Sequence, residues 1–315
     1  MLHVLNGDAT RSAFEAAGLV GDVLVWRDIL VEGPVTTGDD AVPMLDARVE
    51  FLSERLAIER ERYARSAHEQ AAALETARTH DEVVLWFEQD LFCAVNLWRL
   101  LDWFGRRPPV PRLSLVYPST DEVKGLGALE PGALPALFAA RVTVTDEMLA
   151  LGRRAWAVYA GPDPLDSASL VDRDDGALPF VRGALRCHLG RFPSLANGLN
   201  ELETAALAVL RRAPRNFAGL FREVSEHPRV RRHGMGDVQF AAAVRGLTPL
   251  LRALGGEIMQ AELEITQTGR DVVAGDADWL SVRPIDTWLG GVRLVEGRPL
   301  WRWDGARGRL VSTPT

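Results

Sequence analysis

Short apolar runs alternate with longer helical stretches through the first half of the chain. The runs have the length and the branched side chains of strands buried on both faces, as in parallel sheets. Strands of this kind need crossover connections, and the intervening residues 91–104 and 146–159 have helical patterns. The predicted strands are residues 2–5, 22–26, 83–87, 113–117 and 141–144. The pattern predicts an α/β protein that begins with a Rossmann-like, doubly wound, mostly parallel sheet.

Two further stretches of the first half are assigned from composition. Residues 44–78 are charged and Ala-rich, with acidic and basic residues spaced to form helical ion pairs, so they are predicted to form one helix. Residues 160–176 are rich in Pro, Asp and Gly and are predicted to form a linker or a loop. Residues 178–189 are predicted to form a connecting helix.

The pattern changes from Gly198 onward to helices followed by strands. The predicted helices span residues 202–211, 217–226 and 237–254, and residues 261–266 alternate as a strand does. Three helices followed by strands are typical of a winged helix, so a mainly helical winged-helix-like domain is predicted. The tail, residues 292–311, is predicted to be a terminal β-hairpin that turns at Glu296–Gly297.

The length of 315 residues favours about two domains. We assign residues 1–176 to the Rossmann-like domain, 177–197 to a connecting helix and linker, and 198–315 to the winged-helix-like domain. The net charge of −7 is divided unevenly, because residues 1–190 carry −10 and residues 191–315 carry +3. This acidity argues against a nonspecific nucleic-acid coat, although it leaves room for a contact made by the C-terminal half alone.

Composition excludes several other classes of protein. The apolar runs are far shorter than the roughly 20 residues of a membrane span, so no membrane partner is expected. The N-terminus has no basic segment followed by a long apolar stretch, which predicts a cytoplasmic protein. Cys93 and Cys187 are the only cysteines, too few for a disulfide framework or a cysteine-based zinc site.

Polar residues follow the predicted strands, at the edge where ligands bind in open parallel sheets. Gly7 allows a tight turn or a close backbone approach, and the helix that follows offers free N–H groups to an anion. The predicted ligand-binding residues are Asn6, Gly7, Asp8, Thr10, Arg27, Asp28, Glu32, Glu88 and Asp90. The structural alternative is that Asp8 and Asp90 only cap helices and that the other carboxylates are solvated loop residues.

Two more sets of residues are candidates for chemistry. Asp8, Asp28 and Glu88 are the candidate ligands of a divalent metal such as Mg²⁺, which prefers oxygen ligands, if these strand tips converge. The predicted third helix of the winged helix offers few side chains that can read bases, and a basic cluster precedes it. The nucleic-acid contact candidates are Arg229, Arg231, Arg232, Gln239 and Arg245.

Three segments carry a resemblance to a known family. They are residues 3–8 (HVLNGD), residues 21–34 (GDVLVWRDILVEGP) and residues 85–92 (LWFEQDLF), in this order. They resemble a bacterial family known only as domain of unknown function number 1835. Residues 234–237 and 263–269 are similar to the C-terminal region that accompanies it in longer members. The resemblance implies no reaction, but its motifs fall on the predicted strand tips.

Three hypotheses about function follow. In the first, the α/β domain binds a small phosphorylated or nucleotide-like ligand, and the winged helix relays its presence to nucleic acid or to a protein partner. In the second, the protein is a metal-dependent phosphoesterase or nuclease that uses Asp8, Asp28 and Glu88. In the third, it is a structural interaction protein without a ligand. The sequence leaves open whether the protein is an enzyme.

Overall fold

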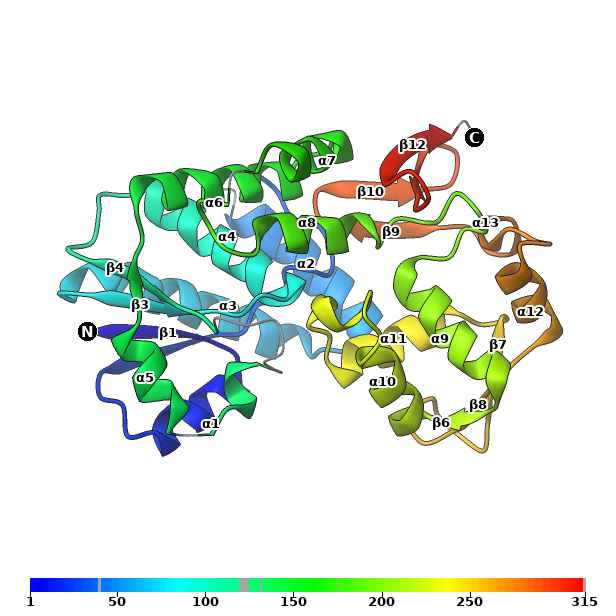
Figure 1. The fold of residues 1–315 in the computed structure, drawn as a ribbon, viewed down its shortest axis with the longest axis horizontal. Coiled ribbons are helices and arrows are strands. Elements are labelled where there is room, and N and C mark those ends of the chain that lie inside the picture. The colour runs from blue at the N-terminus through cyan, green and yellow to red at the C-terminus, as the bar shows by residue number, and fades with distance from the viewer. Residues whose placement is uncertain (39–40, 119–124, 131, 175, 314–315) are drawn as a thin grey trace.

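The computed structural model describes residues 1–315 except 39–40, 119–124, 131, 175 and 314–315. Its largest sheet has the strand order β2-β1-β3-β4-β5 (Figure 1). The strands are β1 (Leu2–Asn6), β2 (Asp22–Trp26), β3 (Val83–Trp86), β4 (Leu113–Val116) and β5 (Val142–Thr143). The first four are parallel and β5 is antiparallel to β4. The prediction of an α/β chain with a mostly parallel sheet is therefore confirmed.

Helices cover both faces of this sheet because its strands alternate between two buried faces. Val4 and Leu85 face a core with α4 and α6, whereas Leu5 and Trp86 face a smaller core with α1 and α5. These helices are α1 (Asp8–Ala16), α4 (Leu91–Gly105), α5 (Ala133–Ala139) and α6 (Asp146–Tyr159). The chain passes from β1 to β2 on one side and then to β3 on the other, which opens a switch point between β1 and β3.

Two predictions for the connections are wrong. The single helix predicted over residues 44–78 is instead α2 (Ala41–Leu56) and α3 (Arg60–Glu75), broken at Ala57 with a φ of 57° and followed by η1 (Thr76–Thr79). The predicted loop over residues 160–176 contains α7 (Pro164–Arg173), which begins at a proline capped by Asp163. The next helix, α8 (Val181–Leu189), packs into the core of the sheet.

A second core, which we call the helical region, lies within residues 199–282. Its elements are α9 (Glu201–Arg212), β6 (Arg215–Asn216), α10 (Phe217–Ser225), η3 (Arg231–His233), α11 (Asp237–Gly246), β7 (Leu251–Leu254), β8 (Glu262–Ile265), α12 (Gln267–Ala274) and α13 (Trp279–Val282). The strands form an antiparallel sheet of order β6-β8-β7. The helix predicted over 237–254 ends at Gly246, because its last residues pair with β8 as strand β7.

The tail forms two hairpins rather than one. β9 (Asp286–Leu289) pairs with β10 (Val292–Val295), and β11 (Leu300–Asp304) pairs with β12 (Arg309–Thr313). The first hairpin turns at Gly290–Gly291, where the Gly291 N–H donates to the Tyr159 carbonyl at the end of α6 (3.0 Å). Leu294 and Leu310 are buried in the core of the parallel sheet, so the chain returns to the first region after building the second.

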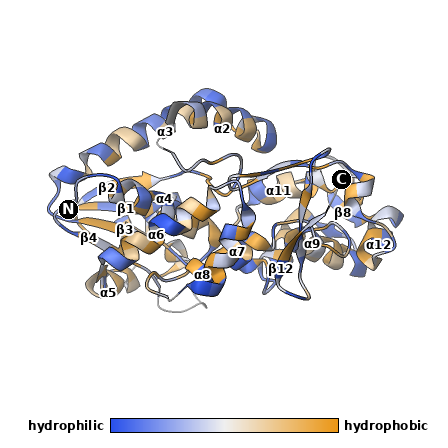
Figure 2. Cartoon of the chain, turned by 90° about the horizontal axis from the view of Figure 1, so that it is seen from above, coloured by the Kyte–Doolittle hydropathy of each residue, from blue (hydrophilic) through white to orange (hydrophobic). Residues whose placement is uncertain are grey.

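No helix within the described residues is both long and apolar enough to cross a membrane. Figure 2 shows α3 and α2 as a pair along one side of the molecule, with α2 nearer the helical region. Ala242 of α11 is buried against Leu52 and Leu56 of α2, so the two regions are in direct contact there.

The packing of the first hairpin predicts the effect of a core truncation. Leu294 is 1% exposed, so Leu294→Ala should lower the free energy of unfolding by about 2–5 kcal/mol. Leu254, in a strand of the other sheet, is 43% exposed, and Leu254→Ala should change it by less than about 0.5 kcal/mol. Urea denaturation curves of both variants measure the difference, and equal costs would contradict the assignment of the hairpin to the core.

Candidate functional site

The turn after β1 contains Gly7 in a conformation that favours glycine, as predicted. Asp8, the next residue, pairs with an arginine. Gly7 has a φ of 86°, a left-handed conformation that favours glycine, and α1 begins immediately after it. Asp8 caps no helix, because its carboxylate accepts two hydrogen bonds from the Arg27 guanidinium (2.7 and 2.8 Å). This pairing lowers the pKa of Asp8. Thr10 is buried and its hydroxyl donates to the Asn6 carbonyl.

Asn6 belongs to an amide network beneath the switch point rather than to an open surface. Its side-chain N–H donates to the Cys93 sulfur (2.8 Å), and its side-chain oxygen accepts from Asn96 (3.0 Å). Asn96, fully buried in α4, also donates to the Asp28 carbonyl and accepts from the Trp26 indole. The network ties the ends of β1 and β2 to α4, so Asn6 has a structural role here.

Asp28 and Glu32 are both held by arginines, of which the one at Asp28 is buried and the one at Glu32 is partly buried. The Asp28 carboxylate accepts from Arg48 and from the Tyr63 hydroxyl, each at 2.7 Å, and Arg48 is 1% exposed. Glu32 forms an ion pair with Arg191 (3.1 Å). Because Asp8 and Asp28 are bound by different arginines, the predicted metal set of Asp8, Asp28 and Glu88 does not gather around one point.

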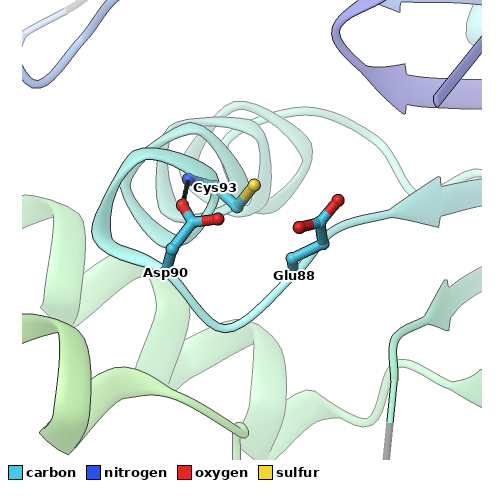
Figure 3. Close-up of side chains that lie close together, drawn as sticks. All are labelled: Glu88, Asp90 and Cys93. Carbon is cyan, nitrogen blue, oxygen red and sulfur yellow. Dashed lines mark hydrogen bonds between the residues drawn. The ribbon is translucent and has the colours of Figure 1, made fainter. Parts of the chain in front are cut away.

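A different group forms at the tip of β3 (Figure 3). Glu88, Asp90 and Cys93 each bring an oxygen or sulfur atom within 4.8 Å of the others, the one such metal-capable group among the described residues. Asp90 caps α4 by accepting from the Cys93 N–H (2.7 Å), and Glu88 accepts from the N–H of Leu126 (2.6 Å) in η2 (Leu126–Ala128). The sequence prediction missed Cys93, although its spacing of three residues from a capping aspartate was visible.

Burial controls the protonation of this group. It raises the pKa of Glu88 to about 7, with a further contribution from the nearby Asp90 charge. Burial also raises the pKa of Asp90, and it raises that of the Cys93 thiol well above its usual range. The group therefore holds protons near neutral pH, and a metal ion would have to displace the thiol proton to use all three ligands.

The tip of β3 faces a cavity of about 660 Å³ that the helical region closes from the other side. The residues around it are Glu88, Gln89, Asp90, Pro118, Phe221, Arg222, Ser225, Glu226, Val230, Arg231, Arg232, Gly234 and Met235. Gly234 has a φ of 65° and lies so close to Asp90 that a side chain at residue 234 would overlap the carboxylate. The site is thus shared between the two regions of the chain.

The three arginines that line the cavity all come from the helical region. Arg231 and Arg232, predicted as nucleic-acid contacts, line the cavity together with Arg222. Neither Arg222 nor Arg231 forms a side-chain hydrogen bond or an ion pair with any described residue, and both are exposed. Guanidinium groups facing a cavity without a protein carboxylate attached are suited to bind an anion bidentately.

The other predicted nucleic-acid contacts lie elsewhere. Arg229 is 3.9 Å from Glu201, and Arg245 is exposed outside the cavity. Gln239 accepts from the Gly236 N–H at the start of α11, so its side-chain oxygen is occupied. The face of α11 that carries Ala242 is covered by α2, which leaves less of this helix open than a recognition helix in a DNA groove requires.

Neither the protein-family models nor the curated protein sequences contain a match to this chain. The resemblance to domain of unknown function number 1835 stays a prediction.

The Asp28 network predicts a large stability difference between two arginines. Arg48→Met leaves a partly buried carboxylate without its cation, so it should lower the free energy of unfolding by about 3–5 kcal/mol. Arg27→Met removes the partner of the exposed Asp8 and should cost less than about 1 kcal/mol. Chemical denaturation at neutral pH compares the two, and similar losses would refute the structural role assigned to Arg48.

The raised pKa of Glu88 predicts a pH-dependent stability. The folded protein keeps this proton up to about pH 7, whereas a glutamate in the unfolded chain loses it at its ordinary pKa of 4.5. The contribution of the proton to stability is therefore complete below about pH 4.5 and is lost as the pH rises through about 7. The free energy of unfolding of Glu88→Gln, taken relative to that of the wild type, should therefore rise by up to roughly 3 kcal/mol from about pH 5 to about pH 8. Denaturant unfolding at both pH values tests this, and a difference independent of pH would exclude it.

Proposed function

We propose that the protein binds a small phosphorylated or nucleotide-like ligand in the cavity between the tip of β3 and the helical region. One observation carries the proposal: Glu88 and Asp90 line the sheet side of the cavity, and Arg222 and Arg231, which form no ion pair with any described residue, line the other side. The volume of about 660 Å³ lies in the usual range of small-molecule sites.

The two sides of the cavity suit the two ends of such a ligand. Arg222, Arg231 and Arg232 offer donors in the fork geometry that matches phosphate oxygens. Glu88 lies opposite and can accept hydrogen bonds from ribose hydroxyl or base N–H groups. The ligand would lie beyond the carboxyl end of β3, beside the switch point, which is the usual position in open α/β sheets.

Two features of the fold favour the predictions of a Rossmann-like region and a winged-helix-like module. The parallel strands and the helices on both faces favour a Rossmann-like region. The order α9-β6-α10-α11-β7-β8, with β8 between β6 and β7, favours a winged-helix-like module. Because α2 covers one face of α11, we favour a protein partner over nucleic acid as the target of the relay.

The metal-dependent hydrolase is the weaker candidate. Its predicted ligands Asp8 and Asp28 are held by arginines, and the group that does gather contains a thiol with a raised pKa. Metal-assisted hydrolysis would require these ion pairs to break or the thiol to lose its proton. Ligand binding requires neither change.

Substitution of the cavity arginines tests the proposal. Arg222→Ala and Arg231→Ala should each weaken binding of ADP, AMP or inorganic phosphate by about tenfold to a hundredfold, because each loses a charged hydrogen bond. Arg245→Ala is the matched control, since Arg245 is exposed on α11 outside the cavity, and it should bind as the wild type does. Isothermal titration calorimetry measures the affinities.

Two outcomes of this titration would reject the proposal. One is that none of these phosphate compounds binds the wild type. The other is that one of them binds and that Arg222→Ala and Arg231→Ala lose no more affinity than Arg245→Ala does.

A further inference from the structure

A second cavity lies on the other side of the η3 segment and has no part in the proposed phosphate site. It measures about 290 Å³ and is enclosed by α2, α11, the start of α9, η3, α13 and the first hairpin. Met235 lines both cavities, and His233 and Gly234, which precede it, line one cavity each. The second cavity is therefore adjacent to the first but is built from different polar groups.

One buried hydrogen-bonding group at this cavity has no partner among the described residues. His233 is 7% exposed, and its Nε2 is buried without a hydrogen-bond partner among the described residues. Burial and the nearby Arg191 lower its pKa to about 3, so the ring is neutral at physiological pH. A neutral imidazole nitrogen forms one hydrogen bond in either tautomer, and an unmet one in the interior is costly.

The acidic and basic groups of the lining differ in their exposure to solvent. Glu203 is partly buried, and one of its carboxylate oxygens accepts from the Asn200 N–H (2.9 Å). Arg55 and Arg283 are exposed, and Arg55 forms no side-chain hydrogen bond or ion pair with any described residue. Leu56, Leu202 and Ile285 supply apolar wall between these groups.

We propose that this cavity binds an α-amino or α-hydroxy acid with an apolar side chain. The carboxylate pairs with Arg55 and Arg283, and the α-ammonium or hydroxyl group donates to Glu203 and bonds to His233. The apolar side chain packs on the leucine and isoleucine wall, and the cavity volume restricts the ligand to a small molecule.

Three matched compounds test this chemistry in the full chain. They are L-leucine, its α-hydroxy analogue and 4-methylpentanoate, which lacks the α-donor but keeps the carboxylate and the side chain. We expect the amino acid, the hydroxy acid or both to bind with a Kd tighter than about 1 mM, and 4-methylpentanoate to bind at least about tenfold more weakly. Isothermal titration calorimetry gives the affinities.

Two variants locate the ligand. Arg55→Ala should weaken binding by about tenfold, whereas Arg62→Ala, an exposed arginine on α3 outside the cavity, should leave it unchanged. Glu203→Gln keeps the oxygen that accepts from Asn200, so the fold should persist. Glu203→Gln should weaken the binding of L-leucine more than that of the hydroxy acid, because only the ammonium group of L-leucine loses an ion pair.

The proposal is overturned if none of the three compounds binds, if 4-methylpentanoate binds as well as the other two, or if Arg55→Ala and Arg62→Ala have equal affinities. Arg231→Ala separates it from the phosphate site. This variant should bind L-leucine or its hydroxy analogue normally, whichever the wild type binds, and a loss equal to that of Arg55→Ala would place the ligand in the other cavity.

Discussion

The close contact between Gly234 and Asp90 determines what this molecule can do with its parallel sheet. Asp90 ends the turn after β3 and caps α4, while Gly234 lies against its carboxylate in a conformation that glycine adopts without strain. At this point the helical region lies directly against the carboxyl edge of the sheet. The packing of Ala242 of α11 on Leu52 and Leu56 of α2 is a second contact between the same two regions.

Much of the acidity of the first half is neutralised within the structure. Asp8, Asp28 and Glu32 have the spacing of a strand-tip site in the sequence, yet each forms an ion pair with an arginine. Arg48 lies 20 residues beyond Asp28 and Arg191 lies 159 residues beyond Glu32, so these pairs exist only through tertiary folding. Glu88 and Asp90 differ because they keep no cationic partner among the described residues. Burial therefore raises the pKa of both, and the Asp90 charge raises that of Glu88 further.

The sequence predicts the parts of the fold that depend on local pattern. Buried strands are continuous apolar runs, and the predicted residues 22–26 coincide with β2. The break between α2 and α3 was not predicted, because the ion-pair spacing continues through Ala57 while the backbone turns there. The return of the tail to the first core was also missed, since alternation in a strand does not show which surface covers it. The strand-tip rule found Glu88 and Asp90 but not the arginines opposite them, which approach through the packing of a distant region.

The short segment from Arg231 to Met235 lies between the two cavities and lines both of them. Arg231 and Gly234 line the larger cavity, while His233 lines the smaller one, so five consecutive residues form a shared wall. η3 also contacts α4 and α8, whose side chains lie in the core of the sheet. Ligands in the two cavities would therefore contact neighbouring residues of one short segment.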